Sequence, residues 1–312
     1  MTGPRRTAGR ATARRAAWAV ALAGVLLPAA GPASALRVTD DRGLILELPG
    51  PARRIVTLAP HLTELMYAAG AGDRLVGTVA YSDFPVAAQR VPRVGDARAL
   101  DLERLVALQP DLVVVWLGGT PQPQLDVLAG LGLRLYYQAP RNLAHIAETL
   151  ERFGVLAGTA EVAQPAAARF RARLAALAEP HRGQRAVSVF HQVWDRPLMT
   201  VGGAHPISEV IALCGGRNVF AGLGALAPVV SIEAVLEADP EVIGSAGDSG
   251  PREAGLGAWL DWPRLRAVAG GQLYVIAPDL ISQAVPRVLD GAEQMCAALD
   301  RARARERARD GR

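Results

Sequence analysis

This 312-residue chain contains no lysine, so arginine supplies all 34 of its basic side chains, and it has only two cysteines. Aromatic residues are also scarce, at 5%. The shortage of cysteine excludes a small scaffold held together by many disulfides. Because half of the residues are apolar and 21% are charged, a disordered chain is excluded as well. The length suffices for one large domain or two ordinary domains.

The positive net charge of +4 lies at the two ends of the chain. Residues 1–35 contain five arginines and no acidic residue, so the net charge without them is −1. The last twelve residues add six arginines against Glu306 and Asp310, which leaves an acidic body. A nucleic-acid binder carries its positive charge on the folded body. We therefore expect no nucleic-acid partner.

The N-terminus has the order of features found in a secretory signal peptide. Arg14 and Arg15 precede an apolar run at residues 16–30, and Ala33-Ser34-Ala35 follows as a cleavage site. The apolar run is shorter than the roughly 20 residues that a membrane span needs, and an uncleaved anchor is the alternative. We expect residues 1–35 to be removed and the mature protein to be exported and soluble.

The two cysteines, Cys214 and Cys296, both lie in the expected mature chain. In an oxidising compartment such a pair favours a disulfide. Closing so long a loop contributes about 4–5 kcal/mol in the chain-entropy account. Two buried free thiols are the alternative.

Apolar runs typical of strands alternate with helical patterns along the chain. Strands are expected at residues 54–58, 75–77, 112–116, 133–137 and 186–190. Helices are expected at residues 102–108, 124–131 and 143–157, with two more beginning at Thr63-Glu64, where Thr63 is the N-cap, and at Ser208-Glu209. This alternation predicts parallel sheets in an α/β layer fold.

Residues 159–180 show no strand signal and are rich in Ala, Leu and Arg, which predicts one long helix with Pro165 in its first turn. We expect an N-terminal α/β lobe at residues 36–158, a connecting helix at 159–181, and a C-terminal α/β lobe at 182–312 that ends in the arginine-rich tail. A ligand cleft is expected between the lobes, at the C-terminal ends of their strands.

A pseudo-repeat supports two lobes of one design. Residues 102–113 align without a gap on residues 232–243, which places Glu103 over Glu233. A glutamate in the first turn of a helix is favoured by the helix dipole. If both side chains are exposed, they form two matched acidic knobs suited to basic pockets on a symmetric partner.

Motifs for chemistry are missing. The sequence has no H-E-x-x-H, C-x-x-C, G-x-S-x-G, G-x-G-x-x-G or Walker motif, so we expect neither a metal site nor a resident cofactor nor an enzyme. An exported α/β enzyme is the alternative from another class. His145 and His181 are expected at the surface, whereas His61, His191 and His205 adjoin strands or helix starts and are able to reach the cleft.

Three of the scarce aromatic residues follow or end predicted strands. Tyr81 lies in a loop after a strand, Trp116 ends a strand, and Trp194 follows the strand that ends near Phe190. Aromatic side chains in these places suit a large planar or macrocyclic ligand. Packing beneath the loops is an equally good interpretation.

The chain resembles the periplasmic cobalamin-binding proteins of ABC importers, within the helical-backbone (class III) family that also carries haem and ferric siderophores. The resemblance covers essentially the whole mature chain. Its motifs are RIVTLAP at 54–60 with Thr63-Glu64-Leu65, YSDFP at 81–85, Leu102-Glu103-Arg104, PDLV at 110–113, WLGG at 116–119, CGG at 214–216 with NVF at 218–220, and Pro286-Arg287.

This resemblance implies two Rossmann-like lobes joined by a single long backbone helix, and roles for several residues. Tyr81 and Trp116 would line the corrin pocket, and Glu103 and Glu233 would dock onto arginine pockets of an inner-membrane permease dimer. Cys214 and Cys296 would form a disulfide. The ligand would be contacted from the other lobe by Asp279, Leu280, Ile281, Ser282 and Gln283.

The sequence also departs from that family. Ala97, Ala227 and Leu280 stand where a cobalamin binder has further pocket tryptophans, and Trp194 is the candidate to compensate. Another corrinoid, haem or a ferric siderophore therefore stays open as the ligand. Haem would need an axial ligand, for which Tyr81 and His191 are the candidates. Our prediction is a monomeric periplasmic protein that captures cobalamin and delivers it to an ABC permease.

Overall fold

The computed structural model describes residues 1–3, 35–96 and 98–310. Almost all of the predicted signal peptide, and Ala97, lie outside the described residues. Within the described part, no helix combines the length and the apolar character that a membrane crossing requires. Residues 35–310 belong to one compact unit.

The N-terminal half is built on a four-stranded parallel sheet. Its strands, in sheet order, are β4 (Leu75–Thr78), β3 (Ile55–Thr57), β5 (Leu112–Trp116) and β6 (Leu135–Gln138). An antiparallel hairpin of β1 (Leu36–Thr39) and β2 (Ile45–Leu48) precedes it. The helices of this half are α1 (Pro60–Ala68), α2 (Leu102–Ala107), α3 (Gln122–Gly130) and α4 (Ala144–Ala157).

The C-terminal half contains a second, mixed sheet. Its strand order is β11 (Leu273–Ile276), β10 (Val242–Ala246), β7 (Val187–Asp195) and β8 (Leu198–Thr200), and β9 (Gly216–Asn218) also pairs with β7. All its pairings are parallel except that of β7 with β8. Its helices are α6 (Pro206–Leu213), α7 (Ile232–Ala238), α8 (Arg266–Ala269), α9 (Pro278–Ile281) and α10 (Val288–Asp310). The predicted α/β class with parallel sheets is confirmed.

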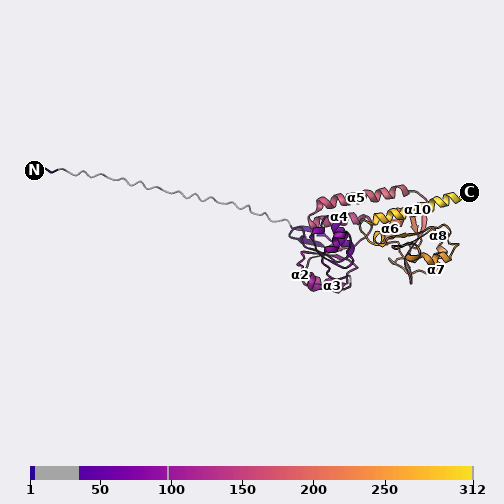
Figure 1. Ribbon diagram of the computed structural model, residues 1–312, viewed down its shortest axis with the longest axis horizontal. Coiled ribbons are helices and arrows are strands. Elements are labelled where there is room, and N and C mark those ends of the chain that lie inside the picture. The colour runs from indigo at the N-terminus through magenta and orange to yellow at the C-terminus, as the bar shows by residue number, and fades with distance from the viewer. Residues whose placement is uncertain (4–34, 97, 311–312) are drawn as a thin grey trace. The chain divides into compact units, whose positions relative to one another are not determined.

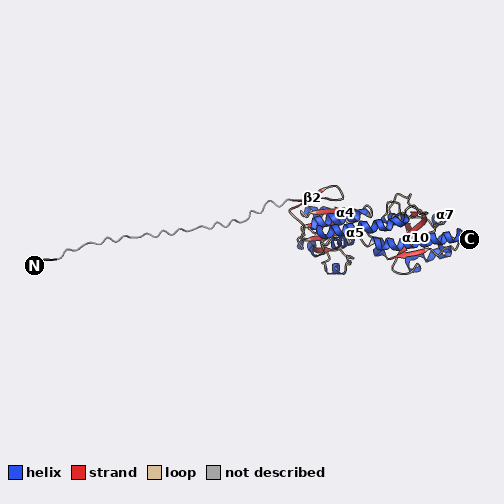
Figure 2. Ribbon diagram, turned by 90° about the horizontal axis from the view of Figure 1, so that it is seen from above, coloured by secondary structure: helices blue, strands red, loops and turns tan. Residues whose placement is uncertain are grey.

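A long helix, α5 (Ala160–Ala178), runs between the two halves, as predicted (Figures 1 and 2). It packs along α4 through Ala163, and a Cβ on Gly154 would collide with that side chain. Farther along, Arg173 forms ion pairs of 2.6 Å and 2.7 Å with Asp290 and Glu293 of α10. The prediction that Pro165 lies in the first turn was wrong, because the helix already begins at Ala160.

One continuous hydrophobic core crosses both halves. Buried side chains of the N-terminal half, such as Leu62 and Phe153, belong to the same cluster as Val189, Ile211 and Leu299 of the C-terminal half. Because protein interiors are close-packed, this shared core resists large relative motion of the lobes.

Two helices begin earlier than predicted. α1 begins at Pro60 and α6 at Pro206, since proline fits the first helical position, where its missing N–H is not needed. Thr63 is therefore not an N-cap: it is fully buried, and its hydroxyl lies 2.6 Å from the hydroxyl of Thr78. His205 takes the N-cap position of α6. The earlier starts place His61 in the first turn of α1 and His205 at the N-cap of α6.

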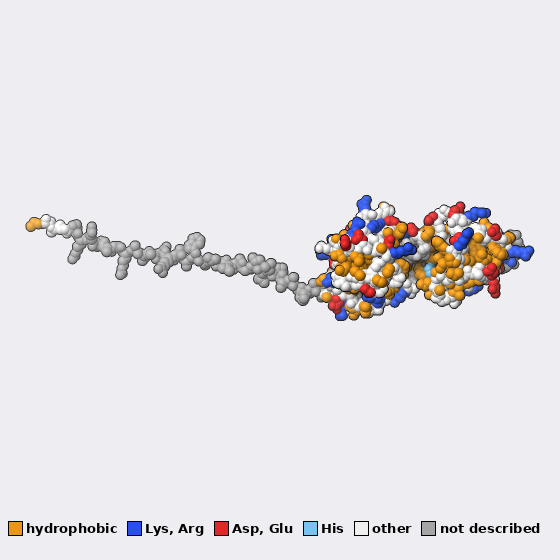
Figure 3. Space-filling model, turned by 90° about the horizontal axis from the view of Figure 1, so that it is seen from below, with side chains coloured by type: hydrophobic (Ala, Val, Ile, Leu, Met, Phe, Trp, Pro, Cys, Tyr) orange, Lys and Arg blue, Asp and Glu red, His pale blue; other side chains and the backbone are white. Residues whose placement is uncertain are grey.

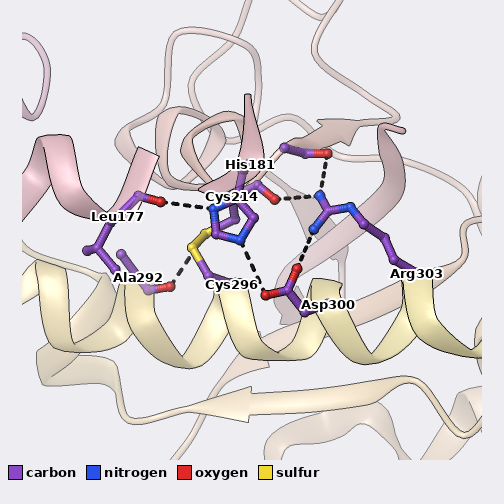
Figure 4. The surroundings of a disulfide bond; sticks show 8 residues. Leu177, His181, Cys214, Ala292, Cys296, Asp300 and Arg303 are labelled. Carbon is purple, nitrogen blue, oxygen red and sulfur yellow. Dashed lines mark hydrogen bonds and ion pairs between the residues drawn. A yellow bond between two sulfur atoms is a disulfide. The ribbon is translucent and has the colours of Figure 1, made fainter. Parts of the chain in front are cut away.

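The predicted disulfide joins Cys214, at the end of α6, to Cys296 of α10, with 4.7 Å between the Cα atoms (Figure 4). Beside it, the guanidinium of Arg303, only 3% exposed, donates hydrogen bonds to the carbonyls of Cys214 and Gly215. His181 lies here between the Leu177 carbonyl and Asp300.

The expected surface positions of His145 and His181 were wrong. His145 is 2% exposed and His181 is 8% exposed. Each imidazole lies close to a carboxylate brought from a distant part of the chain, Asp41 in the first case and Asp300 in the second. Local sequence does not show such partners.

The double substitution Cys214→Ser with Cys296→Ser should lower the free energy of unfolding by about 2–5 kcal/mol, because the crosslink restricts the unfolded chain. Urea unfolding of the oxidised protein and of the variant measures the difference. A reductant should destabilise the parent protein to the same degree and leave the variant unchanged. An equal midpoint for parent and variant would refute a stabilising role.

Candidate functional site

A cavity of about 550 Å³ lies between the two lobes, where the strands of both sheets end. Figure 3 shows the hollow between the lobes with hydrophobic side chains gathered on either side. From the N-terminal lobe it is lined by Pro60, His61, Trp116, Leu117, Gly118, Ala139 and Pro140. From the C-terminal lobe it is lined by Ala204, His205, Pro206, Leu226, Ile281, Ser282, Gln283 and Ala284. This is the edge where α/β sheets bind their ligands.

The N-terminal wall is built around Trp116, the last residue of β5. Its indole is 37% exposed and meets the ring of His61 edge-on, at 5.3 Å between centroids. Nε2 of His61 lies 3.3 Å from the side-chain oxygen of Gln138, at the end of β6. Burial lowers the pKa of His61 to about 4, so the imidazole is neutral and donates this hydrogen bond. Three adjacent elements thus fix the orientation of the indole.

The C-terminal wall contains a second neutral imidazole. Nδ1 of His205 accepts a hydrogen bond of 3.1 Å from the backbone N–H of Ile207, which caps α6. An accepting Nδ1 leaves the proton on Nε2, and burial lowers the pKa of His205. The rest of this wall comes from Ala204, Pro206 and Leu226, and from residues 281–284, which begin at the last residue of α9 and lead toward α10.

The cavity lining includes no carboxylate and no guanidinium. It consists of apolar side chains, one indole, two neutral imidazoles, and the polar side chains of Ser282 and Gln283. Such a lining suits a large, mostly apolar ligand that offers a few hydrogen-bonding groups. Among the residues that the structure describes, no cluster of three His, Cys, Asp or Glu is arranged to hold a metal ion.

An ion pair joins the two lobes beside the cavity. Arg287 donates hydrogen bonds of 2.9 Å and 2.7 Å to the two carboxylate oxygens of Glu64, and Asp279 lies 3.7 Å from the same guanidinium. Burial raises the pKa of Glu64, and the hydrogen bond from Arg287 offsets part of that rise. A second link runs from the backbone N–H of Leu143 to Glu209, at 2.7 Å. The sequence analysis singled out Glu64 and Glu209 at helix starts. It did not predict the bonds that they form with Arg287 and Leu143 of the opposite lobes.

The structure brings only part of the predicted ligand-contacting set to the cavity. Trp116, Ile281, Ser282 and Gln283 line it, whereas Asp279 and Leu280 are adjacent in the chain and do not. The binding roles of all six residues stay predictions.

Tyr81 lies outside the cavity lining and is 83% exposed, with a left-handed φ of 64°. Its loop nevertheless approaches the other lobe, since the guanidinium of Arg287 lies 3.8 Å over the ring of Phe84. The loop is bonded to the end of β4, since the hydroxyl of Thr78 donates a hydrogen bond of 2.8 Å to the hydroxyl of Ser82. The binding role of Tyr81 stays a prediction.

Trp194 lies within β7, not after it, because β7 continues into a hairpin with β8. Its indole is 61% exposed and lines a separate cavity of about 440 Å³ together with Asp195, Asp248 and Glu253. Ala227, which stands where a cobalamin binder has a pocket tryptophan, is exposed and follows Leu226 of the cavity lining.

His191, a candidate haem ligand in the sequence, does not line the interlobe cavity. It is 1% exposed, and its Nδ1 lies 3.1 Å from the hydroxyl of Tyr274. The two imidazoles that do line the cavity, His61 and His205, were only candidates in the sequence. The signal that identifies them is the proline that begins each helix, which precedes His61 and follows His205.

Glu103 and Glu233 are both exposed, in the first turns of α2 and α7. Each helix has a side-chain N-cap: Asp101 accepts from the N–H of Arg104 at 2.9 Å, and Ser231 accepts from that of Ala234 at 3.2 Å. The two lobes therefore present the matched pair of glutamates on equivalent, firmly capped helices.

Residues 55–280 match the family model described as periplasmic binding protein. The chain is 37% identical to the vitamin B12-binding protein of Vibrio campbellii over 248 residues, which cover 79% of this chain and 89% of that protein. It is 36% identical to the vitamin B12-binding protein of Yersinia pestis over 253 residues, which cover 81% and 88%.

Two solved structures resemble the fold. The periplasmic vitamin B12 binding protein BtuF of Vibrio cholerae aligns with a TM-score of 0.75 and 37% identity, covering 82% of this chain and 99% of that one. A periplasmic haem-binding protein from Pseudomonas aeruginosa aligns with a TM-score of 0.68 and 27% identity, covering 79% and 92%.

The substitution Gly119→Ala should displace the indole of Trp116, because a Cβ at this position would collide with the ring. We expect a change in tryptophan near-ultraviolet circular dichroism and a loss of about 1–3 kcal/mol in the free energy of unfolding. Gly130→Ala is the matched control, since a Cβ there meets no atom within 4 Å. Identical spectra for Gly119→Ala and the parent protein would show that the glycine does not position the indole.

Proposed function

This chain belongs to the periplasmic binding protein family, and we propose that it captures cobalamin between its two lobes and delivers it to an ABC permease in the inner membrane. The observation that carries the proposal is the uncharged, largely apolar cavity between the lobes, with Trp116 held rigidly in its wall. The similarity to vitamin B12-binding proteins over most of the chain supports it.

The cavity has the chemistry that a corrinoid requires. The ring of a corrinoid is large and mostly apolar, and its edge carries amide groups that donate and accept hydrogen bonds. Trp116 offers an aromatic surface to the ring, while Ser282 and Gln283 offer polar groups to the amides. Tyr81, which is exposed and outside the cavity lining, would contact a part of the ligand that extends past the rim. Capture of this kind depends on shape and contact and involves no covalent step.

Haem is the second candidate ligand, because two neutral imidazoles line the cavity. A haem iron takes an axial histidine nitrogen. Nε2 of His61 is already bonded to Gln138, whereas Nδ1 of His205 is the nitrogen that caps α6. The Nε2 atom of His205 is therefore the better axial candidate. The haem-binding protein of Pseudomonas aeruginosa, at 27% identity, supports keeping this alternative.

Delivery would use Glu103 and Glu233 as the docking points. They are exposed on equivalent helices of the two lobes, which fits a partner with two-fold symmetry and basic pockets. Export through a cleaved signal peptide at residues 1–35 would place the monomeric protein in the periplasm, where such a permease is accessible.

Isothermal titration of residues 36–312 with cyanocobalamin should give tight one-to-one binding. Trp116→Ala should weaken that binding at least about tenfold, because a buried aromatic contact contributes about 1.4 kcal/mol or more. Trp262→Ala is the matched control, since Trp262 is partly exposed and lines a different cavity.

A parallel titration with hemin separates the candidate ligands. Binding of hemin without binding of cyanocobalamin would replace the corrinoid by haem, and His205→Ala should then abolish the haem Soret shift. No binding of either ligand would overturn both candidates and favour a ferric siderophore.

The double substitution Glu103→Arg with Glu233→Arg should abolish cobalamin uptake by cells and leave the dissociation constant for cobalamin unchanged. Reversal of both charges sets arginine against the basic pockets of the permease. Glu161→Arg with Glu237→Arg is the control, because these glutamates are also exposed and helical. Normal uptake by the first variant would exclude these residues as docking points.

A further inference from the structure

We propose that Asp41, in the turn of the N-terminal β1–β2 hairpin, is a positioning residue that holds one rim of the interlobe cavity in its binding conformation. The proposal rests on the function proposed above and assigns a role in ligand capture to a segment that lies outside the cavity. The proposal is argued from the contact between Asp41 and the end of β6.

Asp41 forms hydrogen bonds with the residues on either side of Gln138, at the end of β6. Its backbone N–H donates a hydrogen bond of 2.9 Å to the carbonyl of Tyr137, and its Oδ2 atom accepts one of 2.7 Å from the N–H of Ala139. The carboxylate is 1% exposed. Gln138, between the two bonded positions, has its own carbonyl directed to β5, where it accepts from the N–H of Leu117 at 2.8 Å.

β6 needs this contact because it is the last strand of its sheet. It pairs with β5 on one side only, so the outward carbonyl of Tyr137 and the outward N–H of Ala139 have no strand partner. Unpaired groups of an edge strand must be bonded in some other way. Asp41 supplies both partners, as an additional strand would.

The residues at the end of β6 belong to the proposed ligand site. Ala139 and Pro140 line the cavity, and Gln138 accepts the hydrogen bond that orients His61 against Trp116. Proline has no N–H, so the loop after β6 has few backbone bonds of its own to hold it. The hydrogen bond from Ala139 to Asp41 is therefore the attachment nearest to the rim.

The carboxylate is itself firmly held. Its Oδ1 atom accepts a hydrogen bond of 2.7 Å from Arg152 and lies 3.2 Å from Nε2 of His145, both on α4. Arg141 approaches the same oxygen at 3.7 Å. Burial alone would raise the pKa of Asp41, but the hydrogen bonds from His145, the Ala139 amide and Arg152 together lower it to about 2. Asp41 thus connects α4 rigidly to the cavity rim.

Asp40, the preceding residue, provides a matched control in the same turn. It is 5% exposed, and its carboxylate accepts hydrogen bonds from the N–H groups of Arg42 and Leu44 and from the Arg42 side chain. All of these partners lie within the hairpin. The Asp40 carboxylate itself has no hydrogen bond to β6, but the Arg42 guanidinium that it holds lies 3.2 Å over the ring of Tyr137. Asp40→Asn therefore tests whether this ring contact, and not the two bonds of Asp41, holds the end of β6.

The test compares Asp41→Asn with Asp40→Asn by three measurements on folded protein. Hydrogen–deuterium exchange of the ligand-free protein reports the Ala139 amide, titration reports the dissociation constant for cyanocobalamin, and urea unfolding reports stability. For Asp41→Asn we expect about three- to tenfold faster exchange at Ala139 and a similar loss of affinity. The amide oxygen that remains is a neutral acceptor, and its hydrogen bond is about half as strong as that of the carboxylate. Asp40→Asn should lose stability and keep the parent values for exchange and binding.

Asp41→Asn leaves Arg152 without its carboxylate partner and risks misfolding. The double variant Asp41→Asn with Arg152→Gln removes both charges, so no unpaired charge remains, and the same changes in exchange and binding are expected. Parent exchange at Ala139, or parent affinity despite faster exchange, would overturn the proposal. Equal loss of affinity in Asp40→Asn would also overturn it, because the hairpin as a whole would then be responsible. If the parent protein binds no cobalamin, the function proposed above fails, and exchange at Ala139 alone decides whether Asp41 holds the rim.

Discussion

The buried carboxylate of Glu64 imposes the relation between the lobes on which the cavity depends. Burial penalises its charge, and a bidentate guanidinium is the partner that best compensates for that penalty. The chain supplies this partner from the opposite lobe, as Arg287, which also covers the ring of Phe84. The walls of the cavity are therefore set at a defined distance by a contact whose disruption would leave a charge buried without its partner.

The exclusive use of arginine has a structural counterpart at this contact and at others. Arg303 donates from one planar group to the backbone carbonyls of Arg185, Cys214 and Gly215 beside the disulfide. Arg152 donates to the carboxylate of Asp41. An ammonium group does not reproduce that geometry. The charged groups are thereby occupied in holding the framework, and the cavity between the lobes is left lined by neutral side chains.

Local sequence patterns sufficed for the α/β class, the long connecting helix and the cysteine pair. They failed where a contact between residues far apart in the sequence determines the local structure. The burial of His145 depends on a carboxylate from the N-terminal hairpin, and β7 extends through Trp194 because β8 returns to pair with it. The helix starts were misplaced because capping side chains were sought where proline begins the helix. The binding roles of Tyr81, Trp194 and residues 279–283 stay predictions, as do the boundaries of the lobes.

Helix α6 has the cavity at one end and the disulfide at the other. His205 caps its start, and Cys214 follows its last turn and is bonded to α10, the helix into which the cavity segment 281–284 leads. Both parts of the C-terminal wall are thus tied together by a bond that forms only in an oxidising compartment. Without this crosslink, α6 and α10 would be joined only by packing and hydrogen bonds. The geometry of the C-terminal wall is therefore sensitive to the redox conditions in which the chain folds.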